Sequence, residues 1–350
     1  ALGVGLAAAG VTAVSLGVVP TAAVGMLTRH QGYGAGVMVT ASHNPYTDNG
    51  YKIFGPTGDK LPDAVLTTLE AGLLNAAPIP PVAGASSPGI VLAEATALYQ
   101  QLLRQTLPAD FSLTGLRLVI DCAYGAQSAI APKFLHDWGA TVVALHHTPN
   151  GQNINDHCGA LHPEALQAAV VKQHADLGLA FDGDADRLIV VDSSGAVIDG
   201  DQIIAAIVQA WHDQGRYHGG VVGTVMTNQA LEDFVINLGY GFARADVGDP
   251  KVVRLMRERD WPIGGEPNGH IIFGALAGCG DALLAAVQFM QVMQYRGQTT
   301  AQVGHTLNLL PAQTRNLRLA PGQNAKTVMA NPDVVAAIDI AREALSGCGR

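Results

Sequence analysis

The sequence has few charged and few aromatic side chains, and it has no dense cluster of basic residues. Charged residues make up 14% of the 350 residues, aromatic residues make up 5%, and the formal net charge at pH 7 is -9. The lack of a basic cluster argues against nucleic acid or an anionic membrane as a partner. A small anionic substrate stays possible, because single arginines and backbone amides bind phosphate.

Cysteine is also scarce. The four cysteines, Cys122, Cys158, Cys279 and Cys348, lie far apart and form neither a CxxC pair nor a zinc-binding spacing. We therefore expect small, buried, free thiols and a reducing compartment, the cytoplasm.

The first 27 residues contain no charged side chain, so the stretch needs to be distinguished from a membrane span. It is rich in Ala and Gly, it contains Pro20, and it has no basic segment of the kind that opens a signal peptide. We predict short elements instead: a helix over 1–9, a strand over 12–16, and a helix that opens at Pro20.

Apolar runs and helix-forming stretches alternate along most of the chain. Strands that are apolar on both faces are typical of parallel sheets covered by helices on either side. The predicted helices include 126–138 and one that begins at Asn228. The predicted strands are 36–39, 116–121, 141–146, 175–181, 188–192, 196–198 and 220–224. Of these, 188–192 and 196–198 form a predicted hairpin. This alternation predicts an α/β fold.

Clusters of turn residues, such as the Pro-, Ala-, Gly- and Ser-rich segment 76–89, divide the chain into units of the usual domain size. We predict three related α/β domains with mixed or parallel sheets. A fourth, α+β domain begins with a strand at 316–319 and a helix from Asn331 to Leu345. The predicted domains are 1–107, 108–199, 200–310 and 311–350.

Three carboxylates alternate directly after a predicted strand, at Asp182, Asp184 and Asp186. On an extended segment, alternate side chains lie on the same side. Solvated aspartates on a surface turn are the alternative. Three acids between apolar runs would repel one another, which favours a bound cation, and hard oxygen ligands suit Mg²⁺. A calcium EF-hand is excluded, because its sixth and twelfth positions hold Arg187 and Ser193. The Arg187 guanidinium suits phosphate.

A second motif, Thr40 to Pro45, follows the predicted strand 36–39 and places Ser42 beside His43 on a turn. A further turn would bring Lys52 back toward Ser42. Serine is a weak nucleophile without a neighbouring base, and His43 or Lys52 could supply one. A turn that merely caps a helix is the alternative. A phosphorylated serine together with a Mg²⁺ site indicates phosphoryl transfer.

Three segments together resemble the phosphoserine, metal and sugar loops of the α-D-phosphohexomutase superfamily. They are TASHNPYTDNGYKIF from Thr40, DGDADR from Asp182 and GGEPNGH from Gly264. The segments 151–155, 158–159 and 225–228 resemble the phosphoglucosamine mutase branch of that superfamily. The similarity extends over essentially the whole chain.

The resemblance implies four domains around a central cleft and a phosphorylated Ser42. It also implies a single Mg²⁺ held by Asp182, Asp184, Asp186 and the Ser42 phosphate. His43 and Lys52 would serve as general acid and base or would position the hydroxyl group, and Arg187 would contact phosphate. The implied substrate-binding residues are Asn44, Arg244, Glu266, Asn268 and His270.

The implied reaction interconverts glucosamine 6-phosphate and glucosamine 1-phosphate through a bisphosphorylated sugar, with a hexose bisphosphate as activator. Glucose or mannose phosphates are alternative substrates. A phosphosugar-binding protein with impaired catalysis and a phosphatase are alternative functions. A homodimer is one assembly that the sequence leaves open.

The chain departs from the family pattern at several positions. Asn268 stands where Ser is usual, Asp246 where Lys is usual and Pro250 where Arg is usual. The loss of two cations would weaken phosphosugar binding. We expect Asp281 to cap a helix rather than to bind substrate.

The family's N-terminal arginine-bearing loop and first strand have no counterpart in residues 1–350. The phosphate-binding loop of its fourth domain has none either. We therefore expect 1–350 to be a fragment, and we predict that it turns over weakly or not at all by itself, because remote binding energy supports kcat as well as KM.

Overall fold

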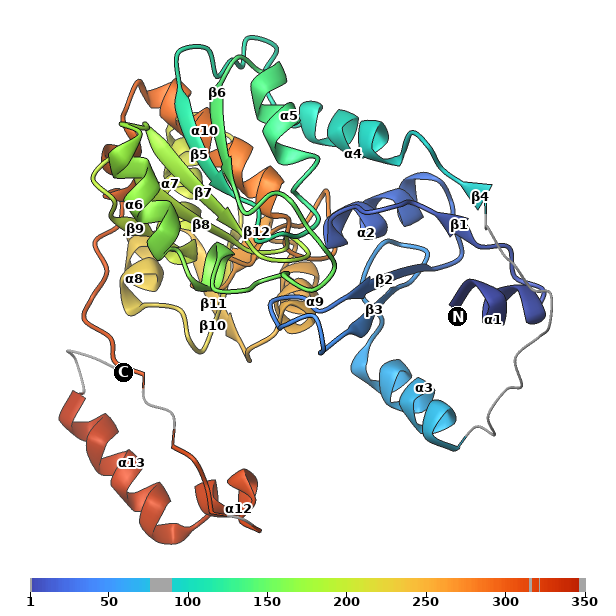
Figure 1. Cartoon of the computed structure of the whole chain (residues 1–350). Helices are drawn as coiled ribbons and strands as arrows, with labels where there is room; N and C mark the ends of the chain where they lie inside the picture. Colours follow the sequence, from blue (N-terminus) through green and yellow to red (C-terminus); the bar gives the residue numbers. More distant parts are fainter. Residues whose placement is uncertain (1, 76–89, 315–316, 321, 346–350) are drawn as a thin grey trace.

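A computed structural model describes residues 2–75, 90–314, 317–320 and 322–345 (Figure 1). The segment 76–89, Cys348 and the first residue of the strand predicted at 316–319 lie outside the described residues. The other three cysteines are free and buried, as predicted. Among the described residues, none of the helices is long and apolar enough to cross a bilayer.

The middle of the chain forms a five-stranded sheet in the order β6-β5-β7-β8-β9. Strands β6, β5 and β7 are parallel, while β7, β8 and β9 pair antiparallel, so β7 and β8 form a hairpin. The predicted strands and the hairpin at 196–198 are confirmed. The strands are β5 (Arg117–Asp121), β6 (Thr141–Leu145), β7 (Leu177–Phe181), β8 (Leu188–Asp192) and β9 (Val197–Ile198).

Helices cover this sheet because its central strands are buried on both faces. Helix α6 packs on β5, β7 and β8, and α5 packs on β6. Helix α10 contacts β8 and then continues into the next unit, where it packs on α7. The helices are α5 (Ala131–Asp137), α6 (Glu164–Lys172), α7 (Gly200–Asp213) and α10 (Ala282–Arg296), with a 3₁₀ turn, η1, at Gly159–Leu161.

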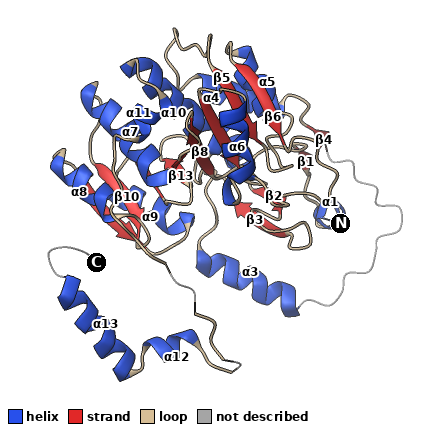
Figure 2. Ribbon diagram, turned by 60° about the vertical axis from the view of Figure 1, so that its left-hand side comes forward, coloured by secondary structure: helices blue, strands red, loops and turns tan. Residues whose placement is uncertain are grey.

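The next unit contains a four-stranded sheet in the order β11-β10-β12-β13, in which only β13 is antiparallel. Helix α9 packs on β10, β11 and β12, and α8 packs on β11 and α7. Figure 2 shows the strands as an inner layer flanked by helices. The elements are β10 (Gly220–Thr224), β11 (Gly241–Ala245), β12 (Ile263–Gly265), β13 (Ile271–Phe273), α8 (Gln229–Asn237), α9 (Asp249–Arg259) and α11 (Thr300–Gly304).

The first unit contains two separate two-stranded sheets, parallel β1-β4 and antiparallel β2-β3. A groove of about 680 Å³ lies between them and is lined mainly by residues 11–19 and 33–39. Helix α2 packs on β2, β3 and α4. The elements are α1 (Leu2–Ala8), β1 (Val14–Ser15), α2 (Thr21–His30), β2 (Gly36–Thr40), β3 (Gly50–Phe54), α3 (Asp63–Asn75), β4 (Ile90–Val91) and α4 (Ala95–Arg104).

Side chains of the first unit contact the unit that contains the four-stranded sheet. The ammonium group of Lys60 lies 2.5 Å from an oxygen of Asp249 at the start of α9, and both side chains are largely buried. The Arg29 guanidinium donates hydrogen bonds to the carbonyl oxygens of Ala275 and Leu276. These contacts hold the first unit next to the loops of the four-stranded sheet.

Two predicted elements differ from the structure. The helix predicted over 126–138 begins only at Ala131, because tight turns precede it: the amides of Ser128 and Ile130 donate to the carbonyls of Gly125 and Gln127, three residues back. The strand predicted at 316–319 is wrong for its described residues, 317–319, which form no regular structure.

Helices α12 (Ala325–Met329) and α13 (Pro332–Leu345) contact each other and bury no residue, and they stand apart from the body in Figure 1. The side chain of Asn331 accepts a hydrogen bond from the amide of Asp333, so the predicted N-cap is confirmed.

Candidate active site

Ser42 lies on the loop between β2 and β3, in a left-handed backbone conformation with φ of 53°. The amide of Ser42 donates to the hydroxyl of Thr40 at 2.8 Å. Antiparallel pairing places Lys52 on β3 opposite Met38 on β2. The Lys52 ammonium group therefore reaches back and donates to Ser42 Oγ at 3.2 Å. The structure thus brings together the serine and the lysine that the sequence singled out.

Asp182, Asp184 and Asp186 lie on the loop between β7 and β8, and their side chains are almost completely buried. One ligand oxygen from each lies within 4.8 Å of the others. Three of their buried oxygens, Asp182 Oδ2, Asp184 Oδ1 and Asp186 Oδ1, have no hydrogen-bond partner. Buried carboxylate oxygens without partners are costly, so this cluster fits a bound cation.

The Lys52 ammonium group lies 2.5 Å from Asp184 Oδ2 and 2.6 Å from Asp186 Oδ2. Burial alone would lower the pKa of Lys52, but these two carboxylates raise it well above its usual value. Burial alone would raise the pKa of Asp186, but His270 and Lys52 hold it well below its usual range. Burial and the two neighbouring carboxylates raise the pKa of Asp182. Lys52 is therefore a cation that links the serine to the acidic cluster.

His43 and Arg187 lie at the edge of this cluster. Burial, followed by the positive charge of Arg187, lowers the pKa of His43, so its imidazole is neutral near pH 7. The Nδ1 atom of His43 is buried without a hydrogen-bond partner. The Nε atom of Arg187 lies 3.9 Å from Asp182 Oδ2 and likewise has no hydrogen-bond partner. Both side chains therefore keep hydrogen-bonding capacity for a ligand.

The segment 264–270 comprises the end of β12 and the turn to β13, and it lies against the acidic loop. His270 pairs with Arg187 in an isolated antiparallel bridge, and His270 Nε2 lies 3.5 Å from Asp186 Oδ1. Glu266 is buried, and its Oε1 accepts a hydrogen bond from the amide of Gly248. The Asn268 side chain accepts a hydrogen bond from the amide of His270.

None of the contacts of Arg244 involves Ser42, Lys52 or the acidic triad. Its guanidinium donates to Glu232, to Gln229 and to the carbonyl oxygens of Thr224 and Thr227. It also lies over the ring of Phe242. The contacts of Arg244 therefore stabilise the end of the four-stranded sheet.

Two residues at the site were missed by sequence reasoning. The amide of Thr21, at the start of α2, donates to the carbonyl of Asp184 at 3.0 Å, and its hydroxyl donates to the Asp184 carboxylate. The Asn155 amide donates to the carbonyls of Ser42 and Asn44. Asn44 itself is exposed. No local signal reveals these contacts, because each joins positions more than a hundred residues apart.

Asp281 caps helix α10, as predicted. Its Oδ1 accepts hydrogen bonds from the amide of Leu284 and from the Tyr99 hydroxyl. Burial raises its pKa to about 6.

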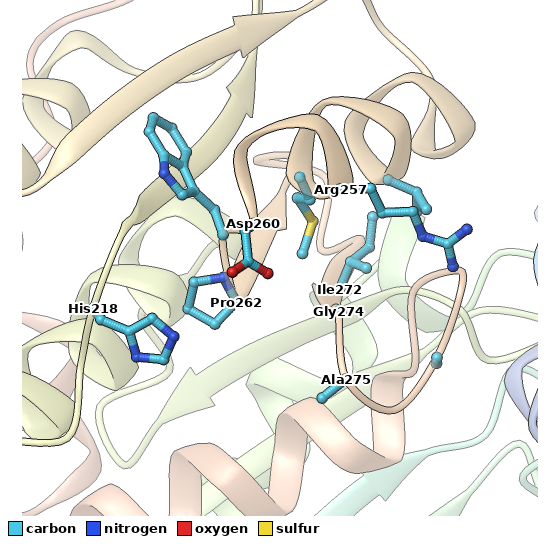
Figure 3. A pocket seen from close by; sticks show the side chains of 11 residues that line it. His218, Arg257, Asp260, Pro262, Ile272, Gly274 and Ala275 are labelled. Atoms are coloured by element: carbon cyan, nitrogen blue, oxygen red, sulfur yellow. The ribbon is translucent and has the colours of Figure 1, made fainter.

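A cavity of about 290 Å³ lies apart from these residues, between the end of α9 and the segment after β13 (Figure 3). Its wall includes His218, Asp260 and Ile272, and Figure 3 shows Arg257 at one side of it. None of the site residues predicted from the sequence lines this cavity.

Loops of all three units thus meet around a serine hydroxyl, a lysine and a buried acidic triad, an arrangement that defines the phosphohexomutase class. Family models describe the same three units. The model of phosphoglucomutase/phosphomannomutase α/β/α domain I matches residues 1–78, that of domain II matches 98–195 and that of domain III matches 199–308.

Individual relatives and solved structures belong to the same family as these models. Phosphoglucosamine mutase of Allorhizobium ampelinum is 45% identical over 326 residues, 92% of this chain and 72% of its own length. A putative phosphomannomutase structure from Thermus thermophilus superposes with a TM-score of 0.77 at 23% identity, over 86% of this chain and 69% of its own. A structure of Aspergillus fumigatus N-acetylphosphoglucosamine mutase in complex with GlcNAc-6P and magnesium superposes with a TM-score of 0.62 at 20% identity. The superposition covers 83% of this chain and 77% of that one.

The chain belongs to the phosphoglucomutase/phosphomannomutase family. The predicted resemblance and the three α/β domains are confirmed. The domain boundaries inferred from the sequence stay predictions.

Proposed function

We propose that the protein is a phosphosugar mutase that interconverts glucosamine 6-phosphate and glucosamine 1-phosphate through a phosphorylated Ser42. One observation carries the proposal: Lys52 joins Ser42 Oγ directly to the buried carboxylates of Asp184 and Asp186. The choice of amino sugar is supported by the curated relatives, which are phosphoglucosamine mutases at 41 to 45% identity.

In the first half-reaction, a sugar hydroxyl oxygen forms a bond to the Ser42 phosphorus, and the bond from phosphorus to Ser42 Oγ breaks. Neutral His43 accepts the proton of the sugar hydroxyl. The Lys52 ammonium group donates a hydrogen bond to Ser42 Oγ as it leaves and stabilises its negative charge. The second half-reaction returns the other phosphoryl group of the sugar bisphosphate to Ser42.

The acidic triad fits Mg²⁺, since its oxygen donors are hard and three of the oxygens are unpaired. Asp182, Asp184 and Asp186 would hold the ion together with a phosphate oxygen on Ser42. When bound, Mg²⁺ supplies positive charge that offsets the negative charge of the transferring phosphoryl group.

We assign the sugar to the turn between β12 and β13. Glu266 would accept hydrogen bonds from sugar hydroxyls, and Asn268 and His270 lie on the same turn. Arg187 and the exposed Asn44 would contact phosphate. The donors of Arg244 are engaged by Glu232 and backbone carbonyls, and its assignment to the substrate stays a prediction. We further propose a cytoplasmic location, which the free, buried cysteines support.

The test is intact-mass spectrometry and coupled turnover on the native full-length protein, primed with a hexose bisphosphate. Glucosamine 6-phosphate, glucose 1-phosphate and mannose 1-phosphate are compared, with Ser42→Ala as the control. We expect one phosphate on Ser42 and the highest kcat/KM for the amino sugar. An absence of phosphate and of turnover would contradict a mutase. Sugar-independent phosphate release would indicate a phosphatase.

A further inference from the structure

The side chain of Asn155 binds the serine loop from another unit, at a point that adjoins the acidic loop. It belongs to the five-stranded unit, yet its Nδ2 donates to the carbonyl of Ser42 at 2.8 Å and to that of Asn44 at 2.9 Å. A side-chain amide group has two N–H donors, and both are used here. The two bonds bracket His43 and engage only backbone atoms, so they hold the path of the chain and leave the side chains free.

The serine loop needs such support. Ser42 adopts a left-handed conformation that is strained for a non-glycine residue and persists only when its surroundings enforce it. Within the loop itself, the amide of Asn44 donates to the carbonyl of Ala41, and that of Ser42 donates to Thr40. The carbonyl groups of Ser42 and Asn44 are held from the other unit, by Asn155.

Asn155 is itself fixed in place. It is left-handed, with φ of 57°, a conformation that Asn adopts more readily than most residues. Its amide donates to the carbonyl of Ala123, and the amide of Ala123 donates to Asp121 Oδ1. The other oxygen of Asp121 accepts from the amide of Gly159 and pairs with His146 Nδ1 at 2.9 Å. A buried carboxylate at the end of β5 thus anchors the loop that presents Asn155.

The same junction contacts the acidic loop at Gly183. A Cβ atom at Gly183 would lie 2.6 Å from the Ser42 carbonyl oxygen, 2.8 Å from Asn155 Nδ2 and 2.7 Å from Ile154 Cδ1. Only glycine permits this approach, so the backbone between Asp182 and Asp184 packs directly on the bonds that Asn155 makes.

We propose that Asn155 is a positioning residue for phosphoryl transfer: its amide holds the Ser42 backbone against the loop of Asp182, Asp184 and Asp186. The inference rests on the proposed function, because the serine must return to one place between the two half-reactions. A displacement of about 1 Å at a reacting group lowers turnover about 100-fold.

The test compares Asn155→Asp with Asn153→Asp in the native protein. Asn155→Asp keeps the shape of the side chain but turns a carboxylate toward two carbonyl oxygens. Asn153→Asp adds the same charge to the same loop, keeps the acceptor for the amide of Asn150 and loses one 3.3 Å bond to the carbonyl of Thr148, which lies outside the serine loop. We expect kcat to fall about 100-fold in Asn155→Asp with KM within about 3-fold, and Asn155→Ala to lie between that variant and the wild type.

Two further measurements separate positioning from a general loss of structure. The affinity for Mg²⁺, measured by calorimetry, should stay within about 3-fold of wild type, because the ligand oxygens are untouched. Phosphorylation of Ser42 by a hexose bisphosphate, followed by intact mass, should slow by the same factor as kcat. Equal kcat values for Asn155→Asp and Asn153→Asp would overturn the inference. So would a fall in kcat accompanied by an increase in KM and a decrease in Mg²⁺ affinity of the same factor.

Hydrogen exchange of the peptide containing residues 40–45 provides a readout that does not depend on turnover. Asn155→Asp should accelerate its exchange, and Asn153→Asp should not. If the wild type turned over none of the phosphosugars, the proposed mutase function would fail, while the exchange rates would still show whether Asn155 holds the serine loop. Unchanged exchange in Asn155→Asp would overturn that hold.

Discussion

Two groups of three potential metal ligands lie at the ends of strands of one sheet, and their carboxylate oxygens are in opposite states. Asp182, Asp184 and Asp186 follow β7, and each has one buried oxygen without a hydrogen-bond partner. Asp121, His146 and Cys158 lie equally close to one another, at the ends of β5 and β6 and beside η1. Both oxygens of Asp121 are hydrogen-bonded, to the amides of Ala123 and Gly159 and to His146.

The difference teaches that proximity of ligands does not by itself make a cation site. In the first group one buried oxygen of each carboxylate has no hydrogen bond, although Lys52 bonds Asp184 and Asp186 through their other oxygens, so the free oxygens favour a cation. In the second group the protein supplies the partners, and burial raises the pKa of the Cys158 thiol to about 12, so the thiolate that a metal needs is disfavoured. The first group is suited to bind an ion. The second group, which we call the Asp121 cluster, holds neighbouring loops together through hydrogen bonds.

The largest expected effect is on turnover and comes from Asp184→Asn. We expect kcat to fall at least about 1,000-fold and the affinity for Mg²⁺ to be lost, because a ligand charge is removed. Stability without Mg²⁺ should change little, since the loss of the Lys52 contact is offset by relief of repulsion. Calorimetric titration measures the affinity for Mg²⁺, and thermal melts without Mg²⁺ measure the stability. Retained Mg²⁺ affinity would show that the triad does not hold the ion.

The reverse pattern is expected for Asp121→Asn. The amide can satisfy at most part of the three contacts that the carboxylate makes, so the free energy of unfolding should fall by about 3 to 4 kcal/mol. Mg²⁺ affinity should be unaffected. Urea unfolding measures the first quantity and titration the second. A stable variant with weakened Mg²⁺ binding would contradict the separation of the two groups.

Asp281 is an intermediate case that sharpens the comparison. Its Oδ1 is paired twice and its Oδ2 is buried without a partner. Burial raises its pKa from 3.8 to about 6, so the folded state prefers the protonated acid. Its contribution to stability is therefore present below about pH 4 and lost as the pH rises through 6, by about 2 to 3 kcal/mol.

Asp281→Asn keeps the helix cap and cannot ionise, so this decline should be absent from its unfolding free energy between pH 4 and 7. Urea unfolding at several pH values, with wild type as the reference, measures the slope. Equal slopes in both proteins would show that Asp281 is ionised throughout this range in the folded state.

The smallest effect is expected from Cys158→Ser. The thiol is a small buried group in the Asp121 cluster, and its replacement should lower the free energy of unfolding by no more than about 1 to 2 kcal/mol. Zn²⁺ should bind neither the wild type nor the variant tightly through this group. Tight Zn²⁺ binding that Cys158→Ser abolishes would make the second group a metal site.

Much of the fold could be predicted from local pattern. The apolar runs at β5, β7 and β8 are buried on both faces, and such runs have few structural alternatives. The start of α5 could not be predicted, because turns precede it and pack on Gly183, a partner far away in the sequence, through the amide of Ala126. The contacts of Arg244 could not be predicted either, since a guanidinium suits phosphate and backbone carbonyls alike.

The chemistry of the candidate site was determined by the sequence itself: the serine, the alternating aspartates and the lysine are set by residue type and by short spacings on strands and turns. Only the tertiary structure decided which buried oxygens lack a hydrogen bond, that Thr21 binds the acidic loop and that Asn155 binds the serine loop. The physical reason is that hydrogen-bond satisfaction depends on partners brought together by packing, and in this protein those partners lie more than a hundred residues apart.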